Sequence, residues 1–364
     1  MCKRIFASQT SESGDVPFYK IGTIGGQADA YISYELFNQY RSRYHFPNQG
    51  ETLITCSGTV GRCIQYDGRP AYFQDSNIVW LHGDRSPITS NFLFRLLSKR
   101  NWKTLNTTTI SRIYSSDLLG LRLFYPPIVE EQERISDFLS LLDQRIEVQN
   151  KIIEEKKREI IVLNDELYSH AIKTIHGFAD IADNYSGLSG KNSEDFGKGA
   201  SYITYLNVLN NRYIDKSSCG YVTIHKNEKQ NTVLYGDVIL TLSSETPEEV
   251  GVSSVYLGND TLYLNSFCFG IRFKTEETVL PEYATWLFST TAFRKHIYPF
   301  AQGSTRYNLN LGSFMKSSFA FPSVDDQRRF AGLLNRLEES TKLEIKMLDE
   351  LKLAKSFLLQ QLFI

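Results

Sequence analysis

The stretch Pro127-Ile128-Val129-Glu130-Glu131-Gln132-Glu133-Arg134-Ile135 decides the fold, together with the long helix that it opens. From Ile135 onward, apolar residues are spaced alternately four and three residues apart. This is the a/d heptad pattern of helices that coil around each other. Gln149 and Lys156 are polar positions in this seam, whose apolar members are Ile135, Leu139, Leu142, Ile146, Ile153, Ile160, Leu163 and Leu167.

The pattern occurs a second time near the C-terminus, after Ser323-Val324-Asp325-Asp326-Gln327-Arg328-Arg329-Phe330. Gln327 minus Gln132 is 195, and adding 195 to a seam position of the first helix gives the matching position of the second. The apolar members of the second seam are Phe330, Leu334, Leu337, Leu348, Leu351, Leu358 and Leu362. Two seams in one register indicate an internal duplication.

The chain of 364 residues is long enough for two hydrophobic cores. The sequence predicts a globular domain over residues 1–126, a helix over 127–175, a second globular domain over 176–321 and a second helix over 322–364. The globular segments combine short strand patterns with few helices, so the predicted fold class is α+β. We expect two similar domains of mixed α/β character, separated by two long helices that pair as an antiparallel coiled coil.

The two globular segments share landmarks in the same order. In the first, strands are predicted over residues 18–21, 52–55 and 77–81, and a short helix over 91–97, capped by Ser90. Three pairs of segments correspond between the domains: 50–55 with 236–241, 91–97 with 283–288, and 109–114 with 303–308. Between these landmarks the sequences differ, so the frame is duplicated and the surface is not.

The polar seam positions Gln149, Lys156, Glu344 and Lys355 fit a role in fixing the register and orientation of the two helices. The alternative is that they mark helix sections exposed to solvent. Phe138 and Val162 lie off the seam and are candidates for an outer face that binds protein partners or packs on a neighbouring domain.

Composition excludes several classes of protein. No apolar run approaches the roughly 20 residues that cross a bilayer, and the first residues lack the apolar core of a signal peptide. The five cysteines form no C-x-x-C pair and the six histidines show no metal-ligand spacing. We therefore expect a cytoplasmic protein without a membrane segment, a metal or a catalytic constellation.

The formal charge of −1 is unevenly distributed. The segment before Pro127 carries roughly +5, the first helix roughly −4, the second globular segment roughly −2 and the last helix about 0. The first globular segment could therefore meet phosphate directly, whereas the second would need a local basic patch or help from a partner.

The duplicated helix starts resemble those of the specificity subunit of type I restriction-modification systems, in which two target-recognition domains alternate with two conserved helices. Pro127, Glu131, Gln132 and Ile135 match that family's Pro-x-x-x-Glu-Gln-x-x-Ile motif closely. The second copy is looser, since Pro322 is displaced by one place, Asp326 replaces Glu and Phe330 replaces Ile. The ending Lys355-Ser356-Phe357-Leu358-Leu359-Gln360-Gln361-Leu362-Phe363 is also similar to the family's usual C-terminus.

One departure from the family pattern concerns the first domain. The second domain begins with His176-Gly177-Phe178-Ala179-Asp180-Ile181, which looks like the family's usual first strand and turn. Nothing ahead of Cys2-Lys3-Arg4-Ile5-Phe6 corresponds to it, so the leading strand of the first domain is expected to be missing.

The resemblance implies a non-catalytic subunit that reads a bipartite, asymmetric site on double-stranded DNA. It also implies assembly with two modification subunits, which would bring S-adenosylmethionine, and with a restriction subunit that translocates and cleaves DNA. A helix rise of 1.5 Å per residue gives roughly 50 Å from Ile135 to Leu167. This length suits half-sites separated by about six to eight unread base pairs.

Base readout needs hydrogen-bonding side chains on loops that can enter a groove, with phosphate contacts fixing the position. The candidates lie in four polar loops and in one arginine pair that could contact phosphate. They are Arg41, Arg43, Ser57, Thr59, Arg62, Thr107, Thr109, Ser111, Arg112, Asn207, Asn210, Arg212, Ser304, Thr305, Arg306 and Asn308. For each of them, the alternative is an ordinary polar surface turn.

Two rival functions remain open. A DNA methyltransferase or nucleotide-hydrolysing component would need a cofactor loop, but Tyr125-Pro126-Pro127-Ile128 lacks the flanking residues of a methyltransferase motif. Ser186-Gly187-Leu188-Ser189-Gly190-Lys191-Asn192 likewise fails as a phosphate loop, because Tyr185 and Asn192 stand where Gly and Ser/Thr belong. A coiled-coil scaffold that binds only proteins is the other alternative, although it would not need two diversified, aromatic-rich domains.

Overall fold

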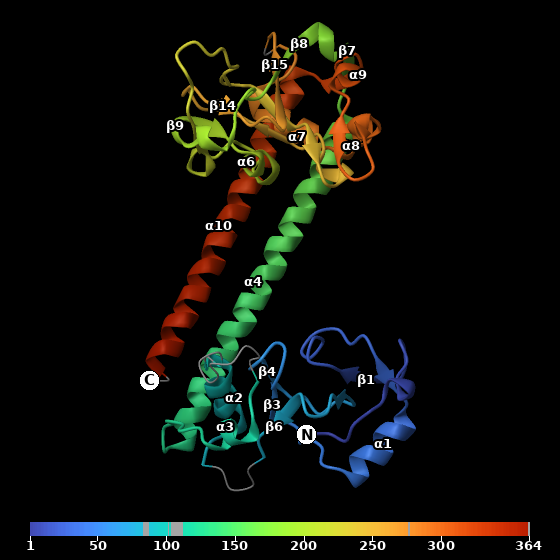
Figure 1. Cartoon of the computed structure of the whole chain (residues 1–364), viewed down its shortest axis with the longest axis vertical. Helices are drawn as coiled ribbons and strands as arrows, with labels where there is room; N and C mark the ends of the chain where they lie inside the picture. The colour runs from blue at the N-terminus through green and yellow to red at the C-terminus, as the bar shows by residue number, and fades with distance from the viewer. Residues whose placement is uncertain (83–86, 101, 103–111, 276, 363–364) are drawn as a thin grey trace. The chain divides into compact units, whose positions relative to one another are not determined.

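The computed structural model describes residues 1–82, 87–100, 102, 112–275 and 277–362. The chain divides into two compact units, residues 1–150 with 347–364 and residues 151–346. Each unit contains one globular domain and a section of each of two long helices, α4 (Val129–His170) and α10 (Val324–Leu362) (Figure 1). Both helices were predicted, and each begins two residues later than expected. Helix α4 ends at His170 because residues 173–177 form a strand instead.

The predicted heptad seam is the buried stripe of both helices. Every seam position of the described residues is buried or half-buried, including the polar ones. In one unit Lys156 Nζ donates to Glu344 Oε1 at 2.7 Å. In the other, Lys355 donates to the Asp143 carboxylate. Because early α4 residues meet late α10 residues and the reverse, the pairing within each unit is antiparallel, as predicted.

The described residues of the second domain form four small sheets. Its largest sheet has the strand order β13-β11-β15-β8 and is antiparallel throughout. The others have the orders β10-β9-β14, β12-β17-β16 and β18-β7. The strands are β7 (Lys173–Gly177), β8 (Ala182–Ser186), β9 (Phe196–Ile203), β10 (Gly220–Val222), β11 (Val238–Thr241), β12 (Ser243–Ser244), β13 (Ser253–Val255), β14 (Tyr263–Leu264), β15 (Cys268–Phe273), β16 (Ala301–Gln302), β17 (Tyr307–Leu309) and β18 (Ser318–Pro322).

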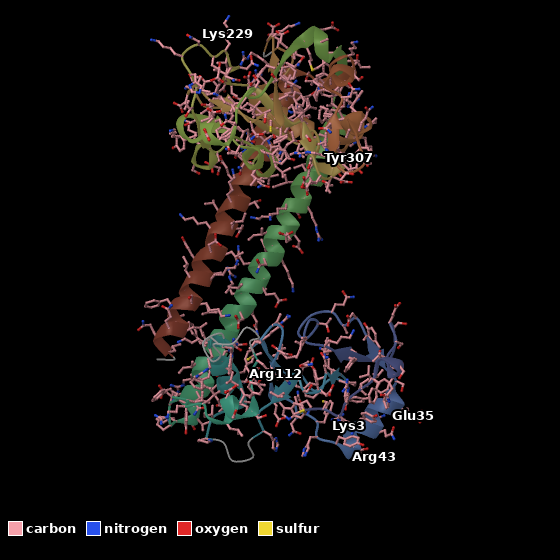
Figure 2. The ribbon with its side chains drawn as sticks, in the orientation of Figure 1. Lys3, Glu35, Arg43, Arg112, Lys229 and Tyr307 are labelled. Carbon is pink, nitrogen blue, oxygen red and sulfur yellow. The ribbon has the colours of Figure 1, made fainter. Side chains whose placement is uncertain are left out.

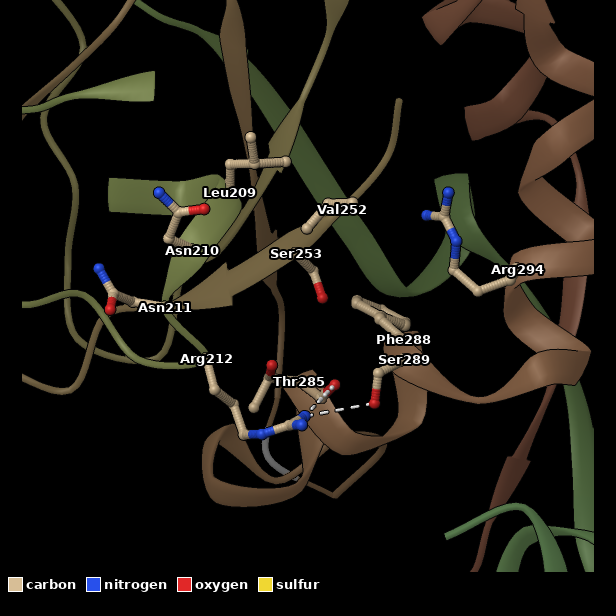
Figure 3. Close-up of a pocket in the computed structure, with 10 residues that line it drawn as sticks. All are labelled: Leu209, Asn210, Asn211, Arg212, Val252, Ser253, Thr285, Phe288, Ser289 and Arg294. Carbon is tan, nitrogen blue, oxygen red and sulfur yellow. Dashed lines mark hydrogen bonds between the residues drawn. The ribbon is translucent and has the colours of Figure 1, made fainter. Parts of the chain in front are cut away.

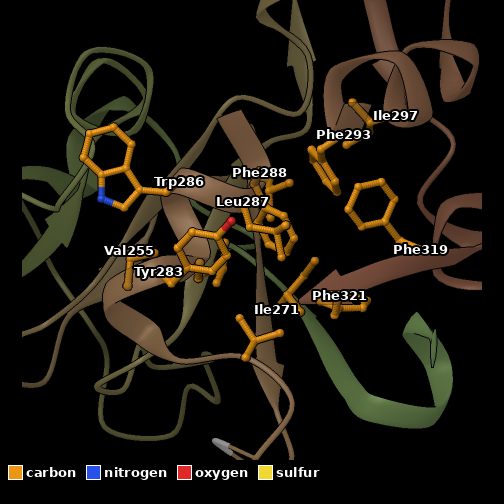
Figure 4. Packing of buried hydrophobic residues seen from close by; sticks show 14 of the residues in the cluster. Val255, Ile271, Tyr283, Trp286, Leu287, Phe288, Phe293, Ile297, Phe319 and Phe321 are labelled. Atoms are coloured by element: carbon orange, nitrogen blue, oxygen red, sulfur yellow. The ribbon is translucent and has the colours of Figure 1, made fainter. Parts of the chain in front are cut away.

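Aromatic side chains fill the core of this domain. Its helices are α5 (Phe178–Ile181), α6 (Tyr205–Asn210), α7 (Pro281–Ser289), α8 (Thr291–Ile297) and α9 (Leu311–Met315). Figure 4 shows Phe288 and Phe293, whose rings stack at 4.4 Å between centroids, close to Phe319 and Phe321. Phe178 lies at the centre of this group and is fully buried. Burial of such large apolar side chains is the main stabilising term of a domain of this size.

The described residues of the first domain repeat the plan with fewer strands. Its sheets have the orders β4-β3-β6 and β2-β1-β5. The elements are β1 (Val16–Tyr19), β2 (Tyr31–Ile32), α1 (Tyr34–Arg43), β3 (Thr52–Thr55), β4 (Cys63–Gln65), β5 (Tyr72–Phe73), β6 (Ile78–Trp80), α2 (Ser90–Lys99) and α3 (Ser115–Leu119). Helix α2 begins as predicted near residue 90, but its cap is Thr89, whose Oγ1 accepts from Phe92 N at 3.3 Å, and not Ser90.

One turn demonstrates the duplication atom by atom. Gly50 N donates to Tyr66 O and Gly236 N donates to Tyr256 O, both at 2.8 Å. Both glycines have positive φ, 87° and 83°, which favours glycine at these positions. The strands β3 and β11 that follow these turns are therefore equivalent, as the sequence indicated.

The outer edge of the first domain's sheet differs from that of the second. Strand β8 covers β15 in the second domain, whereas β6, the counterpart of β15, is the last strand of its sheet among the described residues. A second difference lies just before each long helix. In the second domain, β18 pairs with β7 before α10. In the first domain, residues 120–128 before α4 form no strand, and Phe124 in this segment is 76% exposed.

The glutamine of the helix-start motif has the same structural role in both copies. Gln132 is fully buried; its Oε1 accepts from Thr89 N at 2.9 Å and its Nε2 donates to Pro87 O and Pro126 O. In the second copy, Gln327 Oε1 accepts from Leu280 N at 2.8 Å, and its Nε2 donates to Thr278 O and Pro322 O. In each unit one amide thus joins the long helix to the loop that starts the domain's short helix.

Candidate nucleic-acid interface

A threonine closes the loop after β3 in the first domain. Thr55 N donates to Arg62 O at 3.0 Å, and Gly61 N donates to Thr55 O at 2.8 Å. The Thr55 hydroxyl accepts from Arg62 N at 3.0 Å and donates to Thr59 O. These bonds hold residues 56–61 as a closed loop between β3 and β4.

The same bonds close the corresponding loop of the second domain. Thr241 N donates to Val252 O at 3.0 Å, and Gly251 N donates to Thr241 O at 2.9 Å. The Thr241 hydroxyl accepts from Val252 N at 3.0 Å and donates to Glu249 O. This loop spans residues 242–251 and is four residues longer than residues 56–61. The closure is duplicated while the length and side chains differ.

Two further segments meet each loop at its base. In the first domain, Cys56 N donates to Asn77 O at 2.7 Å and Ile113 N donates to Cys56 O at 2.9 Å. In the second, Leu242 N donates to Phe267 O at 2.7 Å and Leu309 N donates to Leu242 O at 2.8 Å. Three segments that are distant in sequence therefore converge in each domain.

These bonds correct the predicted alignment of segments 109–114 and 303–308. The sequence pairs Arg112 with Arg306, an offset of 194, whereas hydrogen bonding pairs Ile113 with Leu309, an offset of 196. The two arginines therefore occupy positions two residues apart in their segments.

Each arginine nevertheless lies beside the equivalent turn of its own domain. Arg112 Nη2 donates to the carbonyl of Ser76, a residue with φ of 56° that precedes Asn77. Arg306 lies over the Phe267 ring at 4.6 Å and donates from Nε to Ser243 Oγ at 2.8 Å. Phe267 is the counterpart of Asn77, so each domain places a guanidinium group at the base of its loop. Arg112 is labelled in Figure 2.

The remaining predicted residues of the first domain that the structure describes lie in two places. Ser57 Oγ donates to Asn77 Oδ1 at 2.7 Å, Thr59 Oγ1 donates to Ile21 O at 3.1 Å, and Arg62 is exposed. Arg41 and Arg43 are exposed on the last turn of α1, where Figure 2 labels Arg43. Thr107, Thr109 and Ser111 lie outside the described residues.

In the second domain, Ser304, Thr305, Arg306 and Asn308 are all exposed. Asn308 lies in β17, opposite Ser243 and Gln302 in the neighbouring strands. This group therefore gathers hydroxyl, amide and guanidinium groups beside the loop of residues 242–251, as a base-reading surface requires.

Asn207 and Asn210, two other predicted residues, differ in burial. Asn207 is buried, and its side chain donates to Asp215 O at 2.7 Å and accepts from Asp215 N at 3.1 Å, so it fixes the turn after α6. Its neighbour Asn210 is exposed at the end of that helix.

Arg212 joins the second domain to α10. Its Nε donates to Glu338 Oε1 at 3.1 Å, and its guanidinium stacks 3.5 Å from the centroid of Trp286. Figure 3 shows its further bonds to Thr285 O and Ser289 Oγ. Burial lowers the pKa of this guanidinium, and the Glu338 charge opposes that shift. A contact with DNA from Arg212 would require breaking these bonds.

The described part of the chain contains no cluster of three or more histidine, cysteine, aspartate and glutamate side chains suited to a metal ion. Among its helices, none has the length and apolar character that crossing a bilayer requires.

Comparison with known proteins shows which proteins this chain is similar to. A family model described as "Type I restriction modification DNA specificity domain" matches residues 1–158 and 171–353. A putative type I restriction enzyme specificity subunit of Haemophilus influenzae, S.HindORF215P, is 44% identical over 154 residues, which are 42% of this chain. The match spans 39% of that relative's length.

Two solved structures share the fold over nearly the whole chain. A crystal structure of the S subunit of a type I restriction-modification system from M. genitalium superposes with a TM-score of 0.52 and 16% identity, covering 100% of this chain and 92% of the other. A second solved structure concerns the complex assembly and conformational transition of the type I R-M system. It superposes with a TM-score of 0.60 and 13% identity, covering 95% of this chain and 90% of the other. At these identities the likeness concerns the fold.

Proposed function

The chain belongs to the type I restriction-modification DNA specificity family, whose subunits are not catalytic by themselves, and from this we propose that it selects the DNA sequence for a type I complex. In this proposal each globular domain reads one half of a split, asymmetric site on double-stranded DNA. The paired helices hold two modification subunits and a restriction subunit.

The observation that carries the proposal is the duplicated three-segment site. Both domains close a loop with an equivalent threonine and place an arginine at its base, yet the loops differ in length and in sequence. A common frame with different donors and acceptors is what two readers of different half-sites require. Because the side chains differ, the combined site would be asymmetric.

The long helices support the scaffolding half of the proposal. Phe138 and Val162 of α4 are 48% and 55% exposed, and Leu343 and Leu353 of α10 are 69% and 70% exposed. Such apolar side chains outside a filled seam suit contact with protein partners. S-adenosylmethionine would be bound by the modification subunits, and the complex would act on DNA in the cytoplasm.

The test is a methylome measurement. The chain is expressed with its modification subunit in a host without DNA methylation, and modified bases are mapped by single-molecule sequencing. We expect adenine methylation at a split, asymmetric motif. Exchange of residues 173–322, from the start of β7 to the end of β18, should change one half of the motif and leave the other half unchanged.

Two outcomes would contradict the proposal. Absence of methylation from a stable, assembled complex would favour a scaffold that binds proteins without reading DNA. Methylation by the chain alone would make it an enzyme. The exposed apolar residues on α4 and α10 are compatible with the scaffold alternative, which is why assembly and sequence readout must be measured separately.

A further inference from the structure

Arg294, on helix α8, binds the long loop of the second domain through three backbone carbonyls. Its Nη1 donates to Gly251 O at 2.7 Å, and its Nη2 donates to Glu248 O at 2.8 Å and to Val250 O at 2.9 Å. Arg294 lies at the edge of the pocket drawn in Figure 3, with Val252 and Ser253 close by. One planar guanidinium thus fixes the returning arm of residues 242–251.

A second contact from the same helix acts on the same arm. Gly251 has φ of 71°, and a Cβ built on it would lie 2.4 Å from Ile297 Cδ1. The loop backbone therefore packs directly on α8 at Gly251, next to the carbonyl that Arg294 binds. At the opposite end of the loop, Ser244 Oγ donates to the Glu249 carboxylate and closes the loop on itself.

Helix α8 is in turn fixed to α4. Thr291 N and Oγ1 donate to the two carboxylate oxygens of Asp165, at 2.7 and 2.6 Å. The loop is therefore braced by a helix that is itself held by the long helix. The exposed residues of the loop are Glu245, Thr246 and Glu248, which lie between the two fixed ends.

We propose that residues 242–251 form the specificity loop of the second domain and that Arg294 is its positioning residue. The proposal rests on the proposed function, since it names the element that reads one half-site. A loop four residues longer than its counterpart can reach farther into a groove, but it discriminates bases only if it is held in one conformation. Arg294 supplies that order without touching DNA.

The experiment measures the methylated motif of the wild-type complex and of variants in the methylation-free host. Arg294→Ala should relax the base preference in the half-site of the second domain. The ratio of methylation between the preferred and the single-mismatch sequences is expected to fall by roughly tenfold at those positions. The half-site of the first domain should keep its preference, which provides a control within the same complex.

Lys295→Ala is the matched control, because Lys295 is an exposed neighbour on α8 with the same charge, and we expect an unchanged motif. Arg294→Lys keeps the charge but carries its three donors on one atom in place of a planar fork, so it cannot reproduce the two-nitrogen geometry and its motif should also be relaxed. If Arg294→Ala abolishes methylation, a graft that replaces residues 243–251 by residues 57–61 decides the question. Both ends of the graft keep the threonine closure, and it should change the bases preferred in the second half-site.

An unchanged second half-site in Arg294→Ala or in the graft would overturn the proposal, as would equal relaxation of both half-sites. A wild-type complex that methylates no split motif would instead refute the proposed function itself. The two failures are therefore distinguishable.

Discussion

At the scale of single residues, the buried amides of Gln132 and Gln327 have the clearest structural role. Each satisfies one N–H and two carbonyl groups that belong to two different elements. Its acidic neighbour in the motif differs: Glu131 is exposed. The motif therefore carries a structural residue and a surface residue side by side.

Replacement of these neighbours should give unequal effects. Gln132→Ala leaves three polar backbone groups without their partner and is expected to lower the free energy of unfolding of its unit by about 2–4 kcal/mol. Glu131→Ala should change it by less than about 0.5 kcal/mol. Urea unfolding followed by circular dichroism measures both, and equal effects would contradict this role of Gln132.

Arg212 and Arg306 form a second contrasting pair. Arg212→Ala removes an ion pair and a stacked guanidinium from the junction with α10, so we expect a loss of stability of about 2–4 kcal/mol. Arg306→Ala removes an exposed side chain and should weaken DNA binding by about 1–3 kcal/mol with little change in stability. Thermal unfolding and DNA-binding titrations of the assembled complex separate these roles, and the reverse result would reassign both arginines.

At the scale of elements, the sequence predicted the long helices and their antiparallel pairing because a heptad seam is a local, periodic signal. Strand β3 and helices α2 and α7 were also located, since each begins at a recognisable turn or cap.

The alignment of Arg112 with Arg306 was two residues out, because loop lengths between landmarks are not fixed by any period. The contacts of Asn207 and Arg212 were not predicted, since their partners lie far along the chain. Arg294 was missed for the same reason: no local motif marks an arginine that binds carbonyls some 45 residues upstream.

The seam contact of Asp143 gives a pH dependence. Burial of this carboxyl would raise its pKa, but hydrogen bonds from Lys355 and Arg95 outweigh burial and hold the pKa below the usual 3.8. A carboxyl whose pKa is lower in the folded state than in the unfolded state stabilises the protein at pH values above the unfolded-state pKa. This stabilisation is lost as the pH falls through the folded-state pKa. Asp143→Asn should therefore be less stable than wild type at neutral pH and should lose less stability between about pH 5 and 2. Unfolding measured across this range checks the difference, and parallel curves would contradict it.

At the scale of the whole molecule, both compact units contain sections of α4 and α10. A chain cut at residues 171–172, between α4 and β7, should therefore reassemble from its two halves, because each half supplies one helix of the same antiparallel pair. Native mass spectrometry of the co-expressed halves should find a one-to-one complex. Halves that remain separate, or that each form homodimers in preference, would contradict this expectation.

The Lys156–Glu344 contact also bears on which helix pairs with which. In the register observed, a second α4 in place of α10 would set Lys156 opposite Gln149, since 344 minus 195 is 149. A second α10 in place of α4 would set Glu344 opposite Leu351, since 156 plus 195 is 351. Either homotypic pair leaves a half-buried charge without its counter-ion, which favours the mixed pair. Two repeats with identical seams could pair with themselves as readily as with each other; divergence at positions 156 and 344 therefore favours a molecule assembled from two unlike halves.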